Sequence, residues 1–162
     1  MRRGELKAVY VLLTLALMVS GGMATYALLN PPQRERYVII SALNSDQIGV
    51  GLIYAQNGSE YYFYCLVENR LGYTGYFRIE VLRGLILNDT NPSFSECSPW
   101  GNRTVILRDS AETLLRINDT VNITSSFEKY IYYFRLYSYS FDTHVLQYTG
   151  QWVAMQVNVT AM

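Results

Sequence analysis

After residue 36 the chain consists of short runs of aromatic and β-branched residues separated by polar turns. In the clearest run, residues 60–68 (EYYFYCLVE), alternation places Tyr61, Phe63, Cys65 and Val67 on one face of a strand. Tyr62, Tyr64 and Leu66 fall on the other face. Because a strand with one apolar face must cover that face with a second layer, this pattern strongly restricts the possible folds.

Similar runs predict further strands over residues 37–43, 48–54, 73–87, 104–107, 121–125, 130–139 and 145–159. Residues 111–117 fit either a strand or one helical turn. Asn57-Gly58 is a hairpin-type turn, and residues 69–72 and 141–144 are turns. Residues 88–103 read as a polar loop, and Tyr76, Ile79 and Val81 are expected in the core. Seven to eight short strands with polar turns predict an all-β fold, an immunoglobulin-like antiparallel β-sandwich.

The N-terminal segment has a different composition. Residues 1–7 carry Arg2, Arg3 and Lys7 against Glu5, and residues 8–29 then contain no charge. A helix of that length spans about 33 Å, which is enough to cross a hydrocarbon core of about 30 Å. Basic residues before the span predict a cytoplasmic N-terminus. We therefore expect a transmembrane helix over 8–29, a Pro-containing linker over 30–36 and an extracytoplasmic domain over 37–162.

Two other interpretations of this segment remain open. Ala24 and Ala27 are small residues of the kind found at signal-peptide cleavage sites, although the apolar run exceeds the usual length of about 7–15 residues. Alternatively, Arg2-Arg3-Gly4 before an apolar helix resembles the processing site of type IV pilins, which would make the chain a filament subunit beginning at Glu5. Glu5 and Lys7 depart from the apolar or small residues usual there.

Small residues also recur within the apolar run. Ala16, Ser20 and Ala24 are spaced by four residues and therefore share one helical face. Small residues at this spacing let a second transmembrane helix approach closely. The sequence thus predicts lateral packing of this helix into a larger membrane complex.

Six asparagines lie in Asn-x-Ser/Thr triplets, the acceptor motif for N-linked glycan: Asn57, Asn88, Asn102, Asn118, Asn122 and Asn158. All six follow the apolar run, so they agree with an extracellular position of the C-terminal domain. The sequence predicts a glycoprotein in which these asparagines lie at the surface, with sugars over strand ends and loops.

Cys65 and Cys97 are the only cysteines. An even number of cysteines outside the cell favours one disulfide between them. Two cysteines with the single histidine, His144, do not make a zinc site, and we expect neither metal nor cofactor. Beyond residue 30 there are ten basic and twelve acidic residues, a net charge of −2, so no basic patch for nucleic acid is expected.

The sequence contains little that indicates catalysis. His144 and Asp142 form an ordinary turn, and residues 49–51 (GVG) lack the remainder of a dinucleotide motif. Acidic residues are scattered, and a glycosidase-like pair would have to converge in space. Residues 88–89 and 118–119 could supply oxygen ligands to calcium, but glycosylation is the simpler explanation for their asparagines. We expect no enzyme activity.

Fifteen tyrosines are the remaining unusual feature. Residues 130–139 (YIYYFRLYSY) place tyrosines on both faces of one strand. One face can fill the core, whereas the other offers aromatic area of the kind enriched at contact surfaces. The tyrosines therefore have two interpretations. They form a contact face for protein or glycan, or they are present simply because tyrosine favours strands.

Residues 66–72 (LVENRLG) with 76–81 (YFRIEV), and residues 148–152 (YTGQW) with 157–160 (VNVT), carry a resemblance to a known family. The chain resembles a family of archaeal membrane-anchored surface proteins. Their outer domain is an immunoglobulin-like, adhesion-related β-sandwich, and no enzyme activity is established for them. The resemblance covers roughly residues 37–160 and implies a fold and a location.

These observations predict a non-enzymatic, single-pass membrane-anchored surface glycoprotein. Its expected contacts are membrane lipid and other transmembrane or envelope proteins. It would be an accessory or structural subunit of an archaeal envelope complex, either S-layer-associated or part of the translocation or N-glycosylation machinery. The alternatives are the pilin-like filament subunit and a glycan-binding or glycan-acting module.

Overall fold

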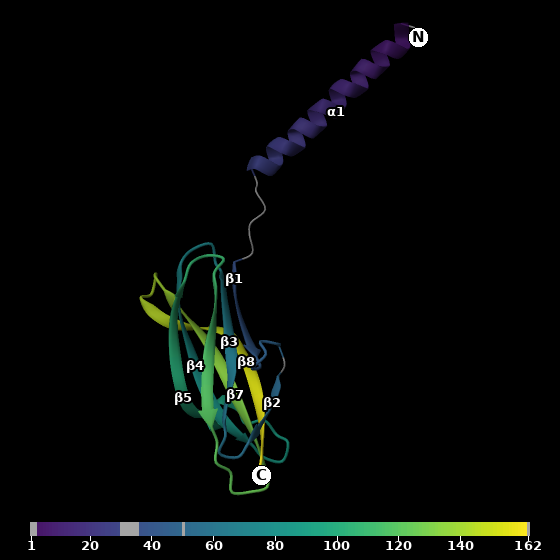
Figure 1. Ribbon diagram of the computed structural model, residues 1–162. Helices are drawn as coiled ribbons and strands as arrows, with labels where there is room; N and C mark the ends of the chain where they lie inside the picture. Colours follow the sequence, from purple (N-terminus) through teal and green to yellow (C-terminus); the bar gives the residue numbers. More distant parts are fainter. Residues whose placement is uncertain (1–2, 30–35, 50, 162) are drawn as a thin grey trace. The chain divides into compact units, whose positions relative to one another are not determined.

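The computed structural model describes residues 3–29, 36–49 and 51–161, in two compact units that divide after Arg34. The first unit is helix α1, Arg3–Leu29, which contains the whole uncharged run 8–29 (Figure 1). Among the described residues, no helix is both long enough and apolar enough to cross a membrane. The helix is thus confirmed, and its transmembrane role is not. The predicted linker lies outside the described residues except for Arg36.

The small residues of α1 are partly described. Ala16 and Ser20 are exposed on the helix, and the Ser20 hydroxyl donates to the carbonyl of Leu17 at 3.2 Å. The side chain of Ala24 lies outside the described residues. Packing of this face against another helix stays a prediction.

The second unit is a β-sandwich of two sheets (Figure 1). The three-stranded sheet has the order β1-β3-β6, and the five-stranded sheet has the order β2-β8-β7-β4-β5. The strands are β1 (Tyr37–Leu43), β2 (Leu52–Gln56), β3 (Glu60–Arg70), β4 (Gly75–Ile86), β5 (Ser98–Leu107), β6 (Glu112–Thr120), β7 (Phe127–Ser140) and β8 (Val145–Thr160). The predicted all-β sandwich is confirmed. It is not wholly antiparallel, because β2 runs parallel to β8.

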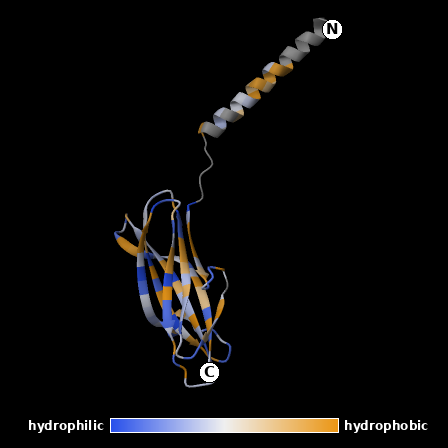
Figure 2. Cartoon of the chain, in the orientation of Figure 1, coloured by the Kyte–Doolittle hydropathy of each residue, from blue (hydrophilic) through white to orange (hydrophobic). Residues whose placement is uncertain are grey.

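Alternation along the strands builds the core between the sheets. Tyr61, Phe63, Cys65 and Val67 of β3 are buried, as their spacing predicts, whereas the residues between them are half-buried. In Figure 2 apolar and polar colours alternate along several strands. The main core of the second unit is completed by buried apolar residues from the opposite sheet: Phe77, Ile79, Val81, Tyr132, Phe134, Leu136, Met155, Val157 and Val159.

Three of the predicted segments differ from the structure. Residues 98–103, read as loop, belong to β5, because they pair with β4 at the edge of the sheet, where polar side chains can remain exposed. Residues 121–125, read as strand, form no ladder. The side chain of Asn57 instead bonds the backbone of Ile123 in both directions, with Ile123 N–H donating at 2.8 Å. The second strand begins at Leu52 rather than at residue 48.

Two further points on the strand predictions are resolved. Residues 112–117 belong to strand β6, so the segment 111–117 is strand from Glu112 onward rather than a helical turn. On β4, Ile79 and Val81 are buried as expected, but Tyr76 is exposed and Phe77 takes the core position beside it. The prediction placed Tyr76 on the wrong face.

Candidate functional site

The outward side of the five-stranded sheet carries a cluster of aromatic and charged side chains. Strand register places Glu80, Arg135 and Trp152 in one row across β4, β7 and β8. Arg78, Tyr137 and Tyr148 form the neighbouring row. Together with Phe94 and Tyr133, which contact the first row, these residues are called the aromatic face below. Alternation sends their strand neighbours, such as Phe134, into the core and places these side chains on the outward side of the sheet.

Arg135 lies at the centre of the aromatic face. Its guanidinium carbon is 5.0 Å from the Tyr148 ring centroid, 5.4 Å from Phe94 and 5.5 Å from Tyr137. It pairs with Glu80 at 3.3 Å, and the Tyr137 hydroxyl donates to Glu80 at 3.0 Å. A delocalised cation that stacks on several rings holds them in fixed orientations. The face is therefore preorganised.

Part of the aromatic face is open. Trp152 is 49% exposed and Tyr148 is 39% exposed. The Trp152 ring packs edge-on against Phe94 at 5.5 Å and against Tyr133 at 5.6 Å between centroids. Burial and the hydrogen bond to Glu80 raise the pKa of Tyr137. Large rings that are fixed and half-exposed supply contact area with little loss of entropy on binding.

The segment between β4 and β5 closes one end of the aromatic face. It contains a short 3₁₀ helix, Phe94–Glu96, whose N-cap is Ser93; the Ser93 backbone N–H donates to the Glu96 carboxylate at 2.6 Å. This bond and that of the Ser93 hydroxyl lower the pKa of Glu96. The Tyr133 hydroxyl donates to the carbonyl of Pro92 at 3.0 Å and ties the segment to β7. Phe94 is thereby held against Arg135.

The predicted disulfide is not present. Cys65 and Cys97 are both free and buried. Cys65 points into the core between the sheets, whereas Cys97 packs with Leu82 and Tyr133 on the outward side of the five-stranded sheet. The sheet therefore separates the two thiols. The prediction was wrong because spacing and compartment do not tell on which side of a sheet a residue lies.

Cys97 has a structural role instead. An added Cβ at Gly84 would lie 2.6 Å from Cys97 Sγ and 2.6 Å from Pro92 Cγ, so these side chains fill the space above the glycine. Burial raises the pKa of the Cys65 thiol to about 12, and burial together with Glu96 raises that of Cys97. Neither thiol is activated for chemistry.

The six acceptor asparagines lie in different environments. Asn88, Asn102, Asn118 and Asn122 are exposed. Asn57 is half-buried and its side-chain amide bonds Ile123. Asn158 is only 8% exposed, and its Oδ1 accepts from Gln156 at 3.0 Å. The expectation that all six asparagines lie at the surface fails at Asn158, because this residue sits inside β8 between two paired strands.

A polar cluster also lies inside the sandwich. Asp119 of β6 accepts from Trp100 Nε1 at 3.1 Å, from Arg83 at 2.9 Å and from the Tyr132 hydroxyl. Tyr132 in turn contacts the Tyr61 hydroxyl. Burial raises the pKa of both tyrosines well above the usual range. Since Asp119 belongs to the three-stranded sheet and its three donors to the other, this cluster fastens the two sheets together.

The candidate catalytic residues do not converge. His144 lies at the exposed turn between β7 and β8, where its Nδ1 is 3.4 Å from the Tyr139 hydroxyl. Asp109 accepts from the backbone of Gly72, and Glu128 accepts from Tyr130. In the part of the chain that the structure describes, no group of three or more His, Cys, Asp or Glu residues could hold a metal ion.

Comparison with known proteins gives only distant matches. No known family matches the sequence, and no curated protein is similar to it. The CARDB domain of the PF1109 protein from Pyrococcus furiosus, solved in complex with di-metal ions, aligns with a TM-score of 0.49 and 16% identity over 80% of this chain and 97% of that chain. Its solution structure aligns with a TM-score of 0.46 and 16% identity over 78% and 98%. PapD-like domain 7 of human CEP192 aligns with a TM-score of 0.44 and 9% identity over 76% of this chain and 84% of that chain.

The sequence indicated some of this face and missed its centre. An outward row of tyrosines on residues 130–139 follows from alternation and was expected. Arg135 and Glu80 were not singled out, although an arginine within an aromatic strand is a signal that could have drawn attention. Phe94 and Trp152 meet this row only through tertiary packing.

Proposed function

We propose that this chain is a non-enzymatic surface glycoprotein whose sandwich contacts another envelope protein through the aromatic face. The main support for this proposal is the pair of half-exposed rings Trp152 and Tyr148. Phe94 packs against Trp152, and Arg135 stacks on Tyr148. Aromatic rings and arginine are the residues most enriched where proteins bind one another. A rigid patch of this composition on an outward sheet face supports a contact role.

The location of the protein is part of the same proposal. Attachment to a membrane through residues 8–29 is supported by the absence of charge in this run and by the basic residues before it. Glycosylation is supported by four exposed acceptor asparagines, Asn88, Asn102, Asn118 and Asn122. The partner would be a further subunit of an envelope complex, which packs beside the helix at Ala16 and Ser20 and against the aromatic face.

The test is chemical cross-linking of the full chain in its native membrane, followed by detergent extraction and mass spectrometry. We expect the amount of cross-linked partner recovered with the double variant W152A/Y148A to be at least tenfold lower than with the unchanged chain. Tyr54→Ala is the matched control, because Tyr54 is 75% exposed on the edge strand β2, away from the face. Equal recovery of the partner from both variants would refute the contact role of the aromatic face.

One observation favours a second function, that of a glycan-binding module. Exposed Trp152 and Tyr148 can stack on the apolar side of a sugar ring, and the adjacent Glu80 and Arg78 can bond its hydroxyls. Titration with soluble oligosaccharides, monitored by tryptophan fluorescence, distinguishes the two functions. Saturable quenching that disappears in Tyr148→Ala, which keeps both tryptophans, would support sugar binding over protein binding.

A further inference from the structure

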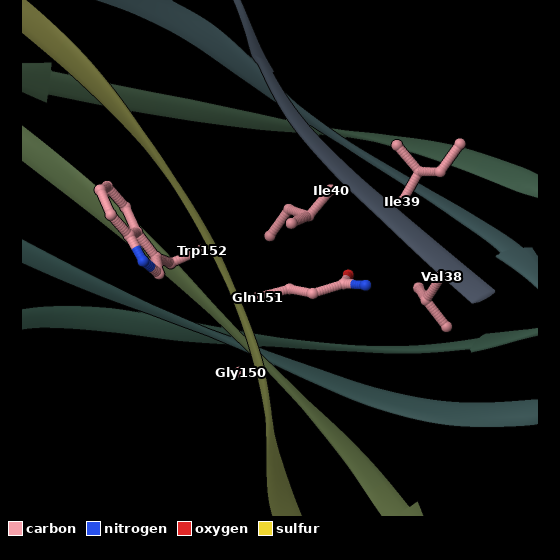
Figure 3. Close-up of a pocket in the computed structure, with 6 residues that line it drawn as sticks. All are labelled: Val38, Ile39, Ile40, Gly150, Gln151 and Trp152. Atoms are coloured by element: carbon pink, nitrogen blue, oxygen red, sulfur yellow. The ribbon is translucent and has the colours of Figure 1, made fainter.

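A groove lies at the edge of the sandwich where β1 passes beside β8. It is lined by Val38, Ile39, Ile40, Gly150, Gln151 and Trp152 and has a volume of about 320 Å³ (Figure 3). Val38 and Ile40 are buried, so the floor of the groove is apolar. Figure 3 shows the side chain of Gln151 extending from β8 toward Val38 and Ile40.

Both walls of this groove are strand edges that lack a partner among the described residues. β1 is the terminal strand of its sheet and pairs only with β3. β8 pairs with β2 only from Gln156 onward, so residues 145–155 have no ladder on that side within the part of the chain described. Unpaired strand edges present backbone donors and acceptors that can pair with an added strand.

Gln151 provides a second, independent observation at the groove. Its Oε1 is buried and has no hydrogen-bond donor in the described structure. The backbone N–H of Gln151 is directed to Thr149 Oγ1 at 3.2 Å, and the strand pairing is irregular here because the register between β7 and β8 shifts. A buried acceptor without a donor costs about 1–3 kcal/mol, so such groups usually have a partner.

The acceptor asparagines leave this edge uncovered. Asn102 lies in β5 and Asn118 in β6, which are the terminal strands at the opposite ends of their sheets from β2 and β1. Neither β1 nor residues 145–155 contain an Asn-x-Ser/Thr triplet. Sugars at Asn102 and Asn118 would obstruct the β5 and β6 edges. The β1 and β2 edges therefore carry no acceptor asparagine, and of these two strands only β1 lines the groove.

We propose that this groove binds an extended segment of another polypeptide chain, which adds as a strand beside β1. Its backbone would pair with the β1 edge, its inward side chains would be apolar and cover Val38 and Ile40, and a donor from it would bond Gln151 Oε1. The groove runs beside three consecutive residues of β1 and three of β8, so it would hold the central part of such a strand. This site is separate from the aromatic face, with Trp152 as the common border.

The test uses the full chain in detergent and a synthetic eight-residue peptide of alternating Val and Thr with blocked ends. Binding is measured by anisotropy of the labelled peptide, and its position by hydrogen–deuterium exchange. We expect at least tenfold slower exchange over residues 37–43 and 145–155. The same peptide with N-methylated valines loses the backbone donors along one edge of the strand and is expected to bind at least tenfold more weakly. Equal binding of the two peptides, or protection confined to β5 and β6, would overturn the proposal.

Two matched variants separate occlusion of the groove from damage to the fold. Ile39→Lys places a charge at the rim of the groove, and Leu114→Lys places one on β6, where the side chain is similarly exposed (37% and 41%). We expect Ile39→Lys to abolish peptide binding and Leu114→Lys to leave it unchanged, at equal melting temperatures. Loss of binding in both variants would refute the proposed location. A dimer that protects β1 and that the peptide does not disperse would reassign the groove to a second copy.

Discussion

Replacing Asp119 with alanine tests the claim that the internal polar cluster fastens the two sheets together. The Asp119 side chain is 11% exposed and accepts from Trp100, Arg83 and Tyr132. Alanine at this position keeps the triplet that makes Asn118 an acceptor for glycan, so glycosylation does not complicate the comparison. It removes one acceptor and leaves three donors to find other partners.

The expected loss can be worked out donor by donor. Hydrogen bonds to a charged group contribute about 1.5–3 kcal/mol each. Tyr132 falls at the low end of this range because it keeps the contact with Tyr61. Arg83 is 37% exposed and keeps water, so its ion pair contributes only about 0.5 kcal/mol. With Trp100 losing its acceptor outright, Asp119→Ala is expected to lower the free energy of unfolding by about 3–5 kcal/mol.

The assay is urea unfolding followed by tryptophan fluorescence, to which Trp100 and Trp152 both contribute. With a slope of about 2 kcal/mol per molar urea, the midpoint should fall by about 2 M. Tyr132→Phe should lose about 1–2 kcal/mol, and the double variant should lose less than the sum of the single losses because the two groups share a bond. Glu112→Ala, at the exposed start of the same strand, is the control and should change stability by less than about 0.5 kcal/mol. A loss below about 1 kcal/mol for Asp119→Ala would refute the reasoning.

Three further predictions concern thiols, pH and glycan. Thiol labelling of the unfolded chain without reductant should detect two free thiols. Cys65 should react only after unfolding because it is fully buried. Detection of no free thiol would show instead that the two cysteines form a disulfide. Burial raises the pKa of Tyr132, so its contribution to stability is fully present below the unfolded pKa of about 10 and is lost as the pH rises above it. Unfolding free energies that stay constant from pH 9 to 12 would contradict this. Site-specific mass spectrometry should find glycan at Asn102 but not at Asn158, and the reverse pattern would contradict the exposures.

The strands that could be predicted are those whose alternation is strict and whose length exceeds the turns around them. Residues 60–68 are the clearest case, because core and outward positions both follow from period two. Prediction failed where the backbone hydrogen bonds of a segment are made by residues far away in the sequence. Residues 121–125 look like a strand, but the amide of Asn57 bonds Ile123 and replaces a ladder. Residues 98–103 look like a loop, but pairing with β4 makes them the edge of a sheet.

The sequence by itself determined an uncharged N-terminal run, the β class of the remainder, the faces of the central strands, and where glycan could be attached. These properties depend on residues that are close together in the chain. Only the tertiary structure decided that Cys65 and Cys97 lie on opposite sides of a sheet, that Asn158 is buried, and that Arg135 gathers rings from three separate segments. The groove beside β1 likewise exists only because two strands more than 100 residues apart are brought together without pairing. Local spacing fixes which way a side chain points along its own strand, whereas what it meets there depends on how the sheets are packed.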